Sequence, residues 1–107
     1  MTVPEISVDE AAHRLEQGTK LLDVRQPDEY ITARVPGGQL LPLHELPARL
    51  AEVPTEGEVL VICRSGARSG KAVEILIQHG VSAVNIAGGT NAWAASGRPT
   101  ASGPDAG

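Results

Sequence analysis

Residues 59–69 read Val-Leu-Val-Ile-Cys-Arg-Ser-Gly-Ala-Arg-Ser, and this stretch determines the predicted fold class. It opens with four consecutive apolar residues, three of them β-branched, a pattern typical of a strand that is covered on both faces. A short loop of small and charged residues follows, and a helix is predicted from about Ser69 to Gly80. The helical positions predicted to face the core are Ala72, Val73, Leu76 and Ile77. A buried strand leading directly into a helix indicates an α/β fold.

The same alternation of strand and helix continues on both sides of this stretch. Further strands are predicted at residues 20–24, 39–43 and 81–86. Helical segments are predicted at residues 26–30, 44–53 and 90–96, and between Ser7 and Gly18, where Ser7 and Glu10 form a capping-box pattern. This order predicts an α/β domain with a mostly parallel central sheet, flanked by helices on both faces.

The length and composition fit one domain. A chain of 107 residues suffices for one domain of this class but not for two. Trp93 and Tyr30 are its only aromatic residues, so the core is expected to be aliphatic. We predict a folded domain over residues 5–97. Residues 98–107 are mostly small residues and prolines, which predicts a disordered C-terminal tail.

Charge and hydropathy argue against several functional classes. The net charge of −4 does not suit a general nucleic-acid binder, which needs a basic face. No apolar run approaches the roughly 18 residues of a membrane span, and the N-terminus does not resemble a signal peptide, so we expect a cytoplasmic protein. A single cysteine and three widely spaced histidines, His13, His44 and His79, give no metal-ligand pattern. We therefore expect no metal and no organic cofactor.

Cys63 is the candidate nucleophile. It lies at the carboxyl end of the predicted buried strand, where open α/β sheets bind ligands, and just before a helix N-terminus. Unpaired amides at that terminus, together with Arg64 and Arg68, are expected to favour a thiolate and lower the thiol pKa. The small residues Ser65 and Gly66, with Ala67, leave those amides open to an anion. The alternative is that Cys63 is an inert, buried apolar side chain, and the local pattern leaves both readings open.

Two phosphate-binding motifs are similar to this loop but do not match it. Residues 66–72 are one residue short of a Walker A loop, and Ala72 stands where Mg²⁺ binding needs serine or threonine. A cysteine phosphatase loop has five residues between its cysteine and arginine, whereas four residues separate Cys63 from Arg68. The tighter ring suits a smaller guest, such as the terminal sulfur of a persulfide.

Four segments, in order, resemble the rhodanese homology domain over about residues 6–97. They are Leu-Leu-Asp-Val-Arg at 21–25 with Asp-Glu-Tyr at 28–30; Val-Pro-Gly-Gly at 35–38 with Leu-Pro at 41–42; the loop at 63–69; and Gly-Gly at 88–89 with Ala-Trp at 92–93. One departure is Ala33-Arg34, where the family usually has Gly-His. This difference concerns local loop geometry rather than chemistry.

The resemblance implies a thiosulfate sulfurtransferase. Cys63 would take sulfane sulfur from a small anionic donor such as thiosulfate, hold it as a persulfide, and pass it to cyanide, a small thiol or a protein thiol. The residues implied in binding the persulfide and the donor are Arg64, Ser65, Gly66, Ala67, Arg68 and Ser69. Arg68 either contacts the donor or braces the loop, and Asp23, Arg25 and Glu29 are expected to form a structural ion-pair set.

A noncatalytic module is the alternative that the resemblance leaves open, because domains of this family also serve in protein binding and regulation. The cationic loop around Cys63 favours the enzyme. As partners we expect only the sulfur donor and a thiophilic acceptor, without nucleic acid or membrane, and we expect a monomer or weak dimer.

Overall fold

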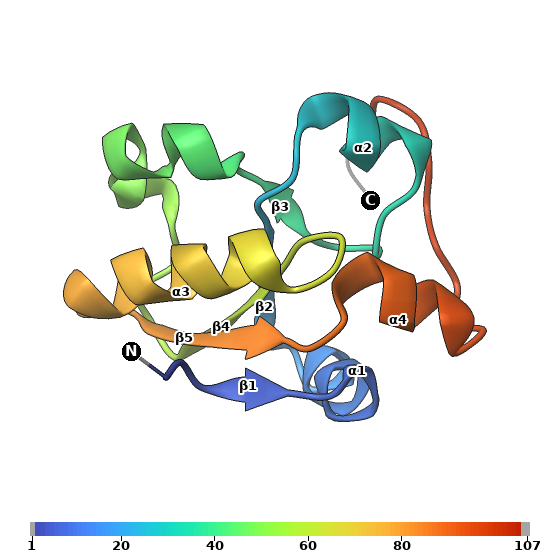
Figure 1. Cartoon of the computed structure of the whole chain (residues 1–107), viewed down its shortest axis with the longest axis horizontal. Coiled ribbons are helices and arrows are strands. Elements are labelled where there is room, and N and C mark those ends of the chain that lie inside the picture. Colours follow the sequence, from blue (N-terminus) through green and yellow to red (C-terminus); the bar gives the residue numbers. More distant parts are fainter. Residues whose placement is uncertain (1, 106–107) are drawn as a thin grey trace.

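The computed structural model describes residues 2–105, and within them five short strands form one sheet (Figure 1). The strands are β1 (Glu5–Ile6), β2 (Lys20–Asp23), β3 (Gln39–Leu40), β4 (Glu58–Ile62) and β5 (Ser82–Ile86). Their spatial order is β1-β5-β4-β2-β3, and each neighbouring pair is parallel. The predicted α/β class with a parallel sheet is confirmed.

β4 occupies the middle of the sheet because its sequence is apolar on both faces. Leu22 of β2 pairs with Val61 on one side, and Asn85 of β5 pairs with the same residue on the other. Residues 59–62 are all buried. Since the polypeptide leaves the sheet directly after Ile62, the central strand places Cys63 at the carboxyl edge.

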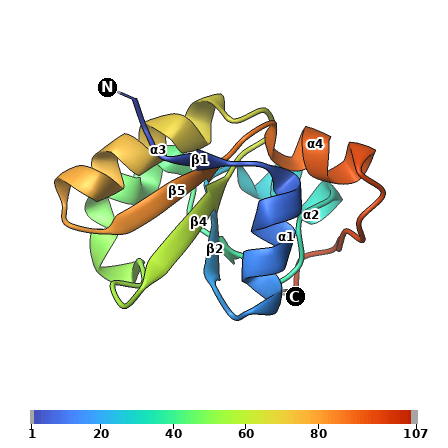
Figure 2. The ribbon, with the colours of Figure 1, turned by 90° about the horizontal axis from the view of Figure 1, so that it is seen from below.

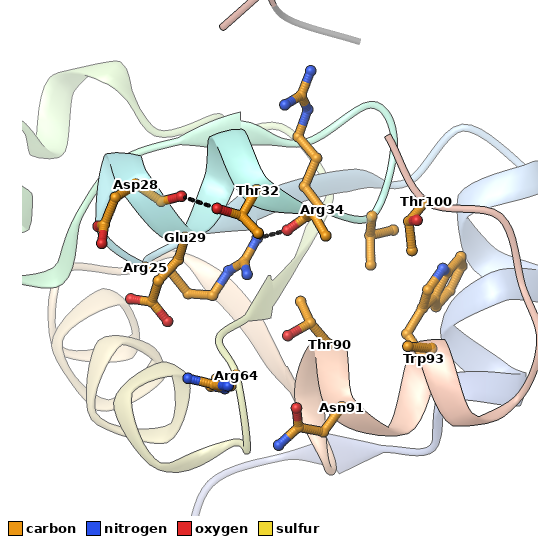
Figure 3. A pocket seen from close by; sticks show the side chains of 13 residues that line it. Arg25, Asp28, Glu29, Thr32, Arg34, Arg64, Thr90, Asn91, Trp93 and Thr100 are labelled. Atoms are coloured by element: carbon orange, nitrogen blue, oxygen red, sulfur yellow. Dashed lines mark hydrogen bonds between the residues drawn. The ribbon is translucent and has the colours of Figure 1, made fainter. Parts of the chain in front are cut away.

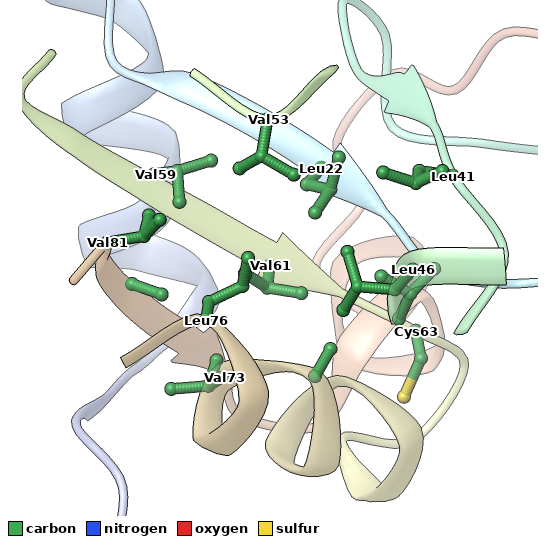
Figure 4. Packing of buried hydrophobic residues seen from close by; sticks show 13 residues of the cluster. Leu22, Leu41, Leu46, Val53, Val59, Val61, Cys63, Val73, Leu76 and Val81 are labelled. Atoms are coloured by element: carbon green, nitrogen blue, oxygen red, sulfur yellow. The ribbon is translucent and has the colours of Figure 1, made fainter. Parts of the chain in front are cut away.

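Helices cover both faces of the sheet, as predicted (Figure 2). The α-helices are α1 (Val8–Glu16), α2 (Pro27–Thr32), α3 (Ala67–Gln78) and α4 (Gly89–Ala95), and two short 3₁₀ segments are η1 (Leu43–Ala48) and η2 (Leu50–Glu52). Successive β4 side chains point to opposite faces. Val59 and Val61 therefore pack in the cluster that includes α3 and η1 (Figure 4), whereas Leu60 and Ile62 pack in the cluster that includes Trp93 of α4.

Several elements differ from the sequence-based expectations. The helical segment expected at residues 44–53 is two 3₁₀ pieces, because Pro47 lacks the amide that a continuous helix needs. The strand expected at residues 39–43 covers only Gln39–Leu40. β1 was not expected from sequence, since two residues carry no readable periodicity. α1 begins after Ser7 as predicted, with the Ser7 hydroxyl accepting from the Glu10 N–H at 3.2 Å.

Residues 98–105, in the segment whose composition predicts a disordered tail, make several hydrogen bonds to the folded domain. The backbones of Arg34 and Ala101 exchange two hydrogen bonds of 2.9 Å, and the Gly103 N–H donates to the Ile31 carbonyl at 2.8 Å. The Trp93 indole N–H donates to the Pro99 carbonyl at 2.9 Å. Composition could not predict these anchors because they lie in the folded domain. Residues 106 and 107 of the expected tail lie outside the described residues.

Within residues 2–105, none of the helices combines the length and the hydrophobicity that crossing a membrane would require.

Candidate active site

The loop between β4 and α3 bends back so that its own donors face the Cys63 sulfur. The Gly66 N–H donates to Cys63 Sγ at 3.1 Å, and the Ser69 hydroxyl lies 3.3 Å from the same atom. Gly66 can cap α3 here because its φ of +107° is a left-handed conformation that favours glycine. Cys63 is 1% exposed and lies at the end of the buried cluster, beside the first turn of α3 (Figure 4).

Hydrogen bonds favour the ionised form of this thiol. Burial raises the pKa of Cys63, but donors from the Ser69 hydroxyl and from the Ser69, Gly66 and Ser65 amides lower it by more. The net result is a pKa below that of an ordinary thiol. A lowered pKa increases the thiolate fraction, and the thiolate is the nucleophilic form of cysteine.

Arg68 braces the loop against α2. Its guanidinium makes two parallel hydrogen bonds to the Glu29 carboxylate, of 2.7 and 2.8 Å. The hydrogen bond from Arg68 lowers the pKa of Glu29 to about 2, so the pair is fully charged at neutral pH. Arg68 also interacts electrostatically with the Cys63 thiolate. A bidentate pair of this kind fixes the first turn of α3, on which Ser69 also lies.

The ion-pair set expected from Asp23, Arg25 and Glu29 is divided in the structure. Arg25 pairs with Asp23 at 2.8 Å and donates to the Ala33 carbonyl at 2.9 Å, and both charged side chains are buried. Glu29 instead pairs with Arg68. The Arg25–Asp23 pair therefore supports the turn after β2, and Glu29 belongs to the loop.

Arg64 lies on the open side of the loop, at a cavity of about 330 Å³ between α2 and α4 (Figure 3). Among residues 2–105 it forms no ion pair, and its side chain is exposed. Thr90, Asn91 and Trp93 of α4 form one wall of this cavity, and Arg25 and Asp28 lie on the opposite side. Cys63 itself does not line this cavity, but the exposed cation of the residue that follows it is suited to attracting a small anion there.

The N-terminal turn of α4 closes over the backbone of the same loop. The amides of Thr90 and Asn91 donate to the carbonyls of Cys63 and Arg64 at 2.8 and 3.1 Å. A Cβ atom on Gly89 would lie 2.2 Å from the Cys63 carbonyl oxygen, so only glycine permits this approach. The Gly88-Gly89 pair thus meets a backbone requirement, as expected from sequence.

Two polar residues of this network, Asn85 and Glu5, are not expected from the sequence patterns. Asn85 is 3% exposed on β5, and its side chain contacts Ser69, the Gly66 carbonyl and the Glu5 carboxylate. The pattern of residues 81–86 indicates a strand but no functional residue. The available signal was a polar residue at an inward position of an otherwise apolar strand, which normally requires a buried hydrogen-bond partner.

In the part of the chain that the structure describes, no three histidine, cysteine or acidic side chains gather as they would to hold a metal ion. His13 and His79 are exposed at α1 and at the end of α3.

The chain is similar to known proteins both in sequence and in fold. A family model described as the rhodanese-like domain matches residues 7–96. A sulfurtransferase of Allochromatium vinosum is 39% identical over 100 residues, covering 91% of this chain and 94% of its own. The crystal structure of a rhodanese-related protein from Thermoplasma volcanium superposes with a TM-score of 0.87 at 30% identity, covering 92% of this chain and 97% of that one. A thiosulfate sulfurtransferase from Pseudomonas aeruginosa superposes with a TM-score of 0.86 at 28% identity, but this chain covers only 21% of it.

Proposed function

The chain belongs to the rhodanese-like domain family, and we propose that it is a thiosulfate sulfurtransferase that carries sulfur as a persulfide on Cys63. The family membership and the sulfurtransferase from Allochromatium vinosum support a role in sulfur transfer. The observation that carries the finer proposal is the set of donors aimed at Cys63 Sγ from Gly66 and Ser69. Such donors stabilise a sulfur anion without a metal or organic cofactor.

In the loading step, the Cys63 thiolate attacks the sulfane sulfur of thiosulfate. An electron pair of Sγ forms the new sulfur–sulfur bond, and the old bond to the sulfonate sulfur breaks with its pair leaving on sulfite. The products are the Cys63 persulfide anion and sulfite, so the total charge of −3 is unchanged. The negative charge has moved from Sγ to the terminal sulfur.

In the unloading step, a nucleophile such as cyanide or a thiolate attacks the terminal sulfur. The bond to Sγ breaks, its electron pair returns to Cys63 as the thiolate, and thiocyanate or a new persulfide leaves. A lowered thiol pKa assists this step because a less basic thiolate is a better leaving group. The hydrogen-bond donors of Gly66 and Ser69 therefore stabilise the Sγ thiolate both before the loading step and after the unloading step.

The other loop residues attract the donor, stabilise the persulfide and hold the loop in place. Arg64, exposed at the cavity, attracts the anionic donor by charge. The amides of Ser65, Gly66, Ala67 and Ser69 are the proposed donors to the persulfide, in a ring too small for a phosphoryl group. Arg68 holds the loop through Glu29 rather than contacting the donor.

Mass spectrometry after incubation with thiosulfate tests this proposal. Because Cys63 is the single cysteine, loading should add about 32 Da, one sulfur atom, at that residue, and Cys63→Ser should abolish it. With no second cysteine to form an internal disulfide, the desalted, loaded protein should keep the added mass until cyanide is supplied and thiocyanate appears. A folded protein that takes up no sulfur would instead fit a noncatalytic binding module.

A further inference from the structure

The buried amide of Asn85 can adopt only one orientation. Its Nδ2 group lies 3.0 Å from the Glu5 carboxylate and 3.1 Å from the Gly66 carbonyl oxygen. Both of these atoms accept hydrogen bonds and neither donates, so the amide must present its N–H groups to them. Its oxygen, Oδ1, is left facing the Ser69 hydroxyl at 2.5 Å.

The Ser69 hydroxyl therefore has two acceptors for one proton. Asn85 Oδ1 lies on one side and Cys63 Sγ, at 3.3 Å, on the other. A hydroxyl carries one hydrogen, so it can donate to only one of them at a time. Ser69 is completely buried, so no solvent competes, and each acceptor left without the proton loses a hydrogen bond.

We propose that the Ser69 proton alternates between Cys63 Sγ and Asn85 Oδ1 during sulfur transfer, which makes Asn85 a positioning residue for the nucleophile. When Sγ carries the negative charge, Ser69 donates to it. When Sγ is neutral, as a thiol or as the inner sulfur of the persulfide, Ser69 turns back to Asn85. The statement about the persulfide rests on the proposed function. The statement about the thiol and the thiolate depends only on the ionisation of Cys63.

The direction of the effect follows from counting hydrogen bonds. Ionisation of Cys63 draws the Ser69 proton away from Asn85, so the stronger new bond to the charged thiolate is partly offset by the neutral bond that is lost. Without an acceptor at position 85, ionisation gains the same bond and loses none. Asn85 therefore keeps the thiol pKa from falling further, and it satisfies the buried hydroxyl while sulfur is loaded.

The charged groups around the sulfur do not provide this control. Arg68 interacts with the thiolate from α3, but its charge is paired with Glu29 of α2. Asp23 and Arg25 at the end of β2 are paired with each other, and Arg64 points to the cavity. Glu5 of β1 faces Asn85, and its role is to fix the amide.

The test is the pH dependence of Cys63 alkylation by iodoacetamide in Asn85→Leu, a change of similar shape without polar atoms. We expect the midpoint to fall by about 0.5 to 1 pH unit, the value of one net hydrogen bond. In a Ser69→Ala background the same change should leave the midpoint unaltered, because the hydroxyl that connects the two residues is gone. Asn85→Ala serves as a second, smaller replacement if leucine prevents folding.

Val84→Ala is the matched control, since Val84 lies on the same strand but packs in the cluster on the opposite face. It should destabilise the protein and leave the midpoint unchanged. A midpoint that is unchanged or raised in the Asn85 variants, or one that falls equally without the Ser69 hydroxyl, would overturn the proposal.

A second measurement is the rate of sulfur transfer from the sulfur-loaded protein. Desalted persulfide of Asn85→Leu should transfer sulfur to cyanide about two- to threefold faster than wild type, because the leaving thiolate is less basic. Unchanged or slower transfer would refute alternation during turnover. Alkylation needs no sulfur donor, so a protein that shows the midpoint shift but cannot be loaded would contradict the proposed function and not the hydrogen-bond relationship.

Discussion

Replacing Glu29 by glutamine removes one charge from the pair that braces the loop. Arg68 contacts both carboxylate oxygens of Glu29, at 2.7 and 2.8 Å, and this contact lowers the pKa of Glu29 from 4.5 to about 2. Glu29→Gln keeps the size of the side chain and one oxygen acceptor. It therefore isolates the contribution of the charge to stability.

The magnitude follows from linkage between ionisation and folding. The full pKa difference corresponds to at most about 3.5 kcal/mol, since one pKa unit is about 1.4 kcal/mol. The two side chains are 36% and 21% exposed, so solvent screens their attraction, and we expect a loss of about 1–2 kcal/mol. Because the folded pKa is depressed, this stabilisation is present above pH 4.5 and is lost as the pH falls toward 2.

Urea unfolding followed by circular dichroism over a pH series measures this contribution. Near pH 7, Glu29→Gln should unfold at a lower urea concentration than wild type, and the difference should shrink below pH 4.5 and close near pH 2. Glu52→Gln is the matched control because Glu52 forms a comparable two-oxygen pair with Arg49. The Glu52 side chain is 47% exposed, so this substitution should lower the free energy of unfolding by less than Glu29→Gln does. Equal stability at pH 7, or a difference that persists unchanged at low pH, would refute the reasoning.

Three further predictions follow from the site. Cys63 should be alkylated by iodoacetamide with a midpoint below the roughly 8.5 of a free thiol, and Ser69→Ala should raise that midpoint; a wild-type midpoint at or above that value would contradict the hydrogen-bond argument. Arg64→Ala should raise the KM for thiosulfate several-fold at unchanged unfolding free energy, whereas unaltered kinetics would leave Arg64 without a part in donor binding. Gly89→Ala should cost about 2–5 kcal/mol of stability, because its Cβ would collide with the Cys63 carbonyl, whereas Gly97→Ala, at a similar φ in open space, should cost only about 1 kcal/mol; equal losses in thermal denaturation would argue against that collision.

The central strand and the loop after it could be predicted because their signals are local. Residues 59–62 are apolar on both faces, and Gly66 with the small residues beside it indicates a tight turn into α3. The order of strands and helices then leaves few alternatives to a parallel sheet. Cys63 could be singled out on the same grounds, from its place between strand and helix.

Contacts between distant segments could not be predicted in this way. The pairing of Glu29 with Arg68 spans 39 residues, and the contact of Asn85 with Glu5 spans 80. Sequence patterns report which face of an element is buried, but not which polar side chain meets it from elsewhere in the chain. The sequence indicates the backbone amides and the two arginines beside Cys63, but it does not indicate that Arg68 is paired with Glu29 or that the Ser69 hydroxyl donates to the sulfur.

The closure of α4 over the loop has a consequence for the protein during its synthesis. The carbonyls of Cys63 and Arg64 are held by amides of Thr90 and Asn91, residues that leave the ribosome some 27 residues after the cysteine does. A nascent chain that ends before Ser82 has neither these donors nor β5, whose Asn85 contacts the Ser69 hydroxyl. Its cysteine should titrate near the roughly 8.5 of a free thiol and remain mostly protonated at neutral pH. The hydrogen-bonded surroundings of Cys63 are therefore complete only when segments far later in the chain have joined the sheet and the loop.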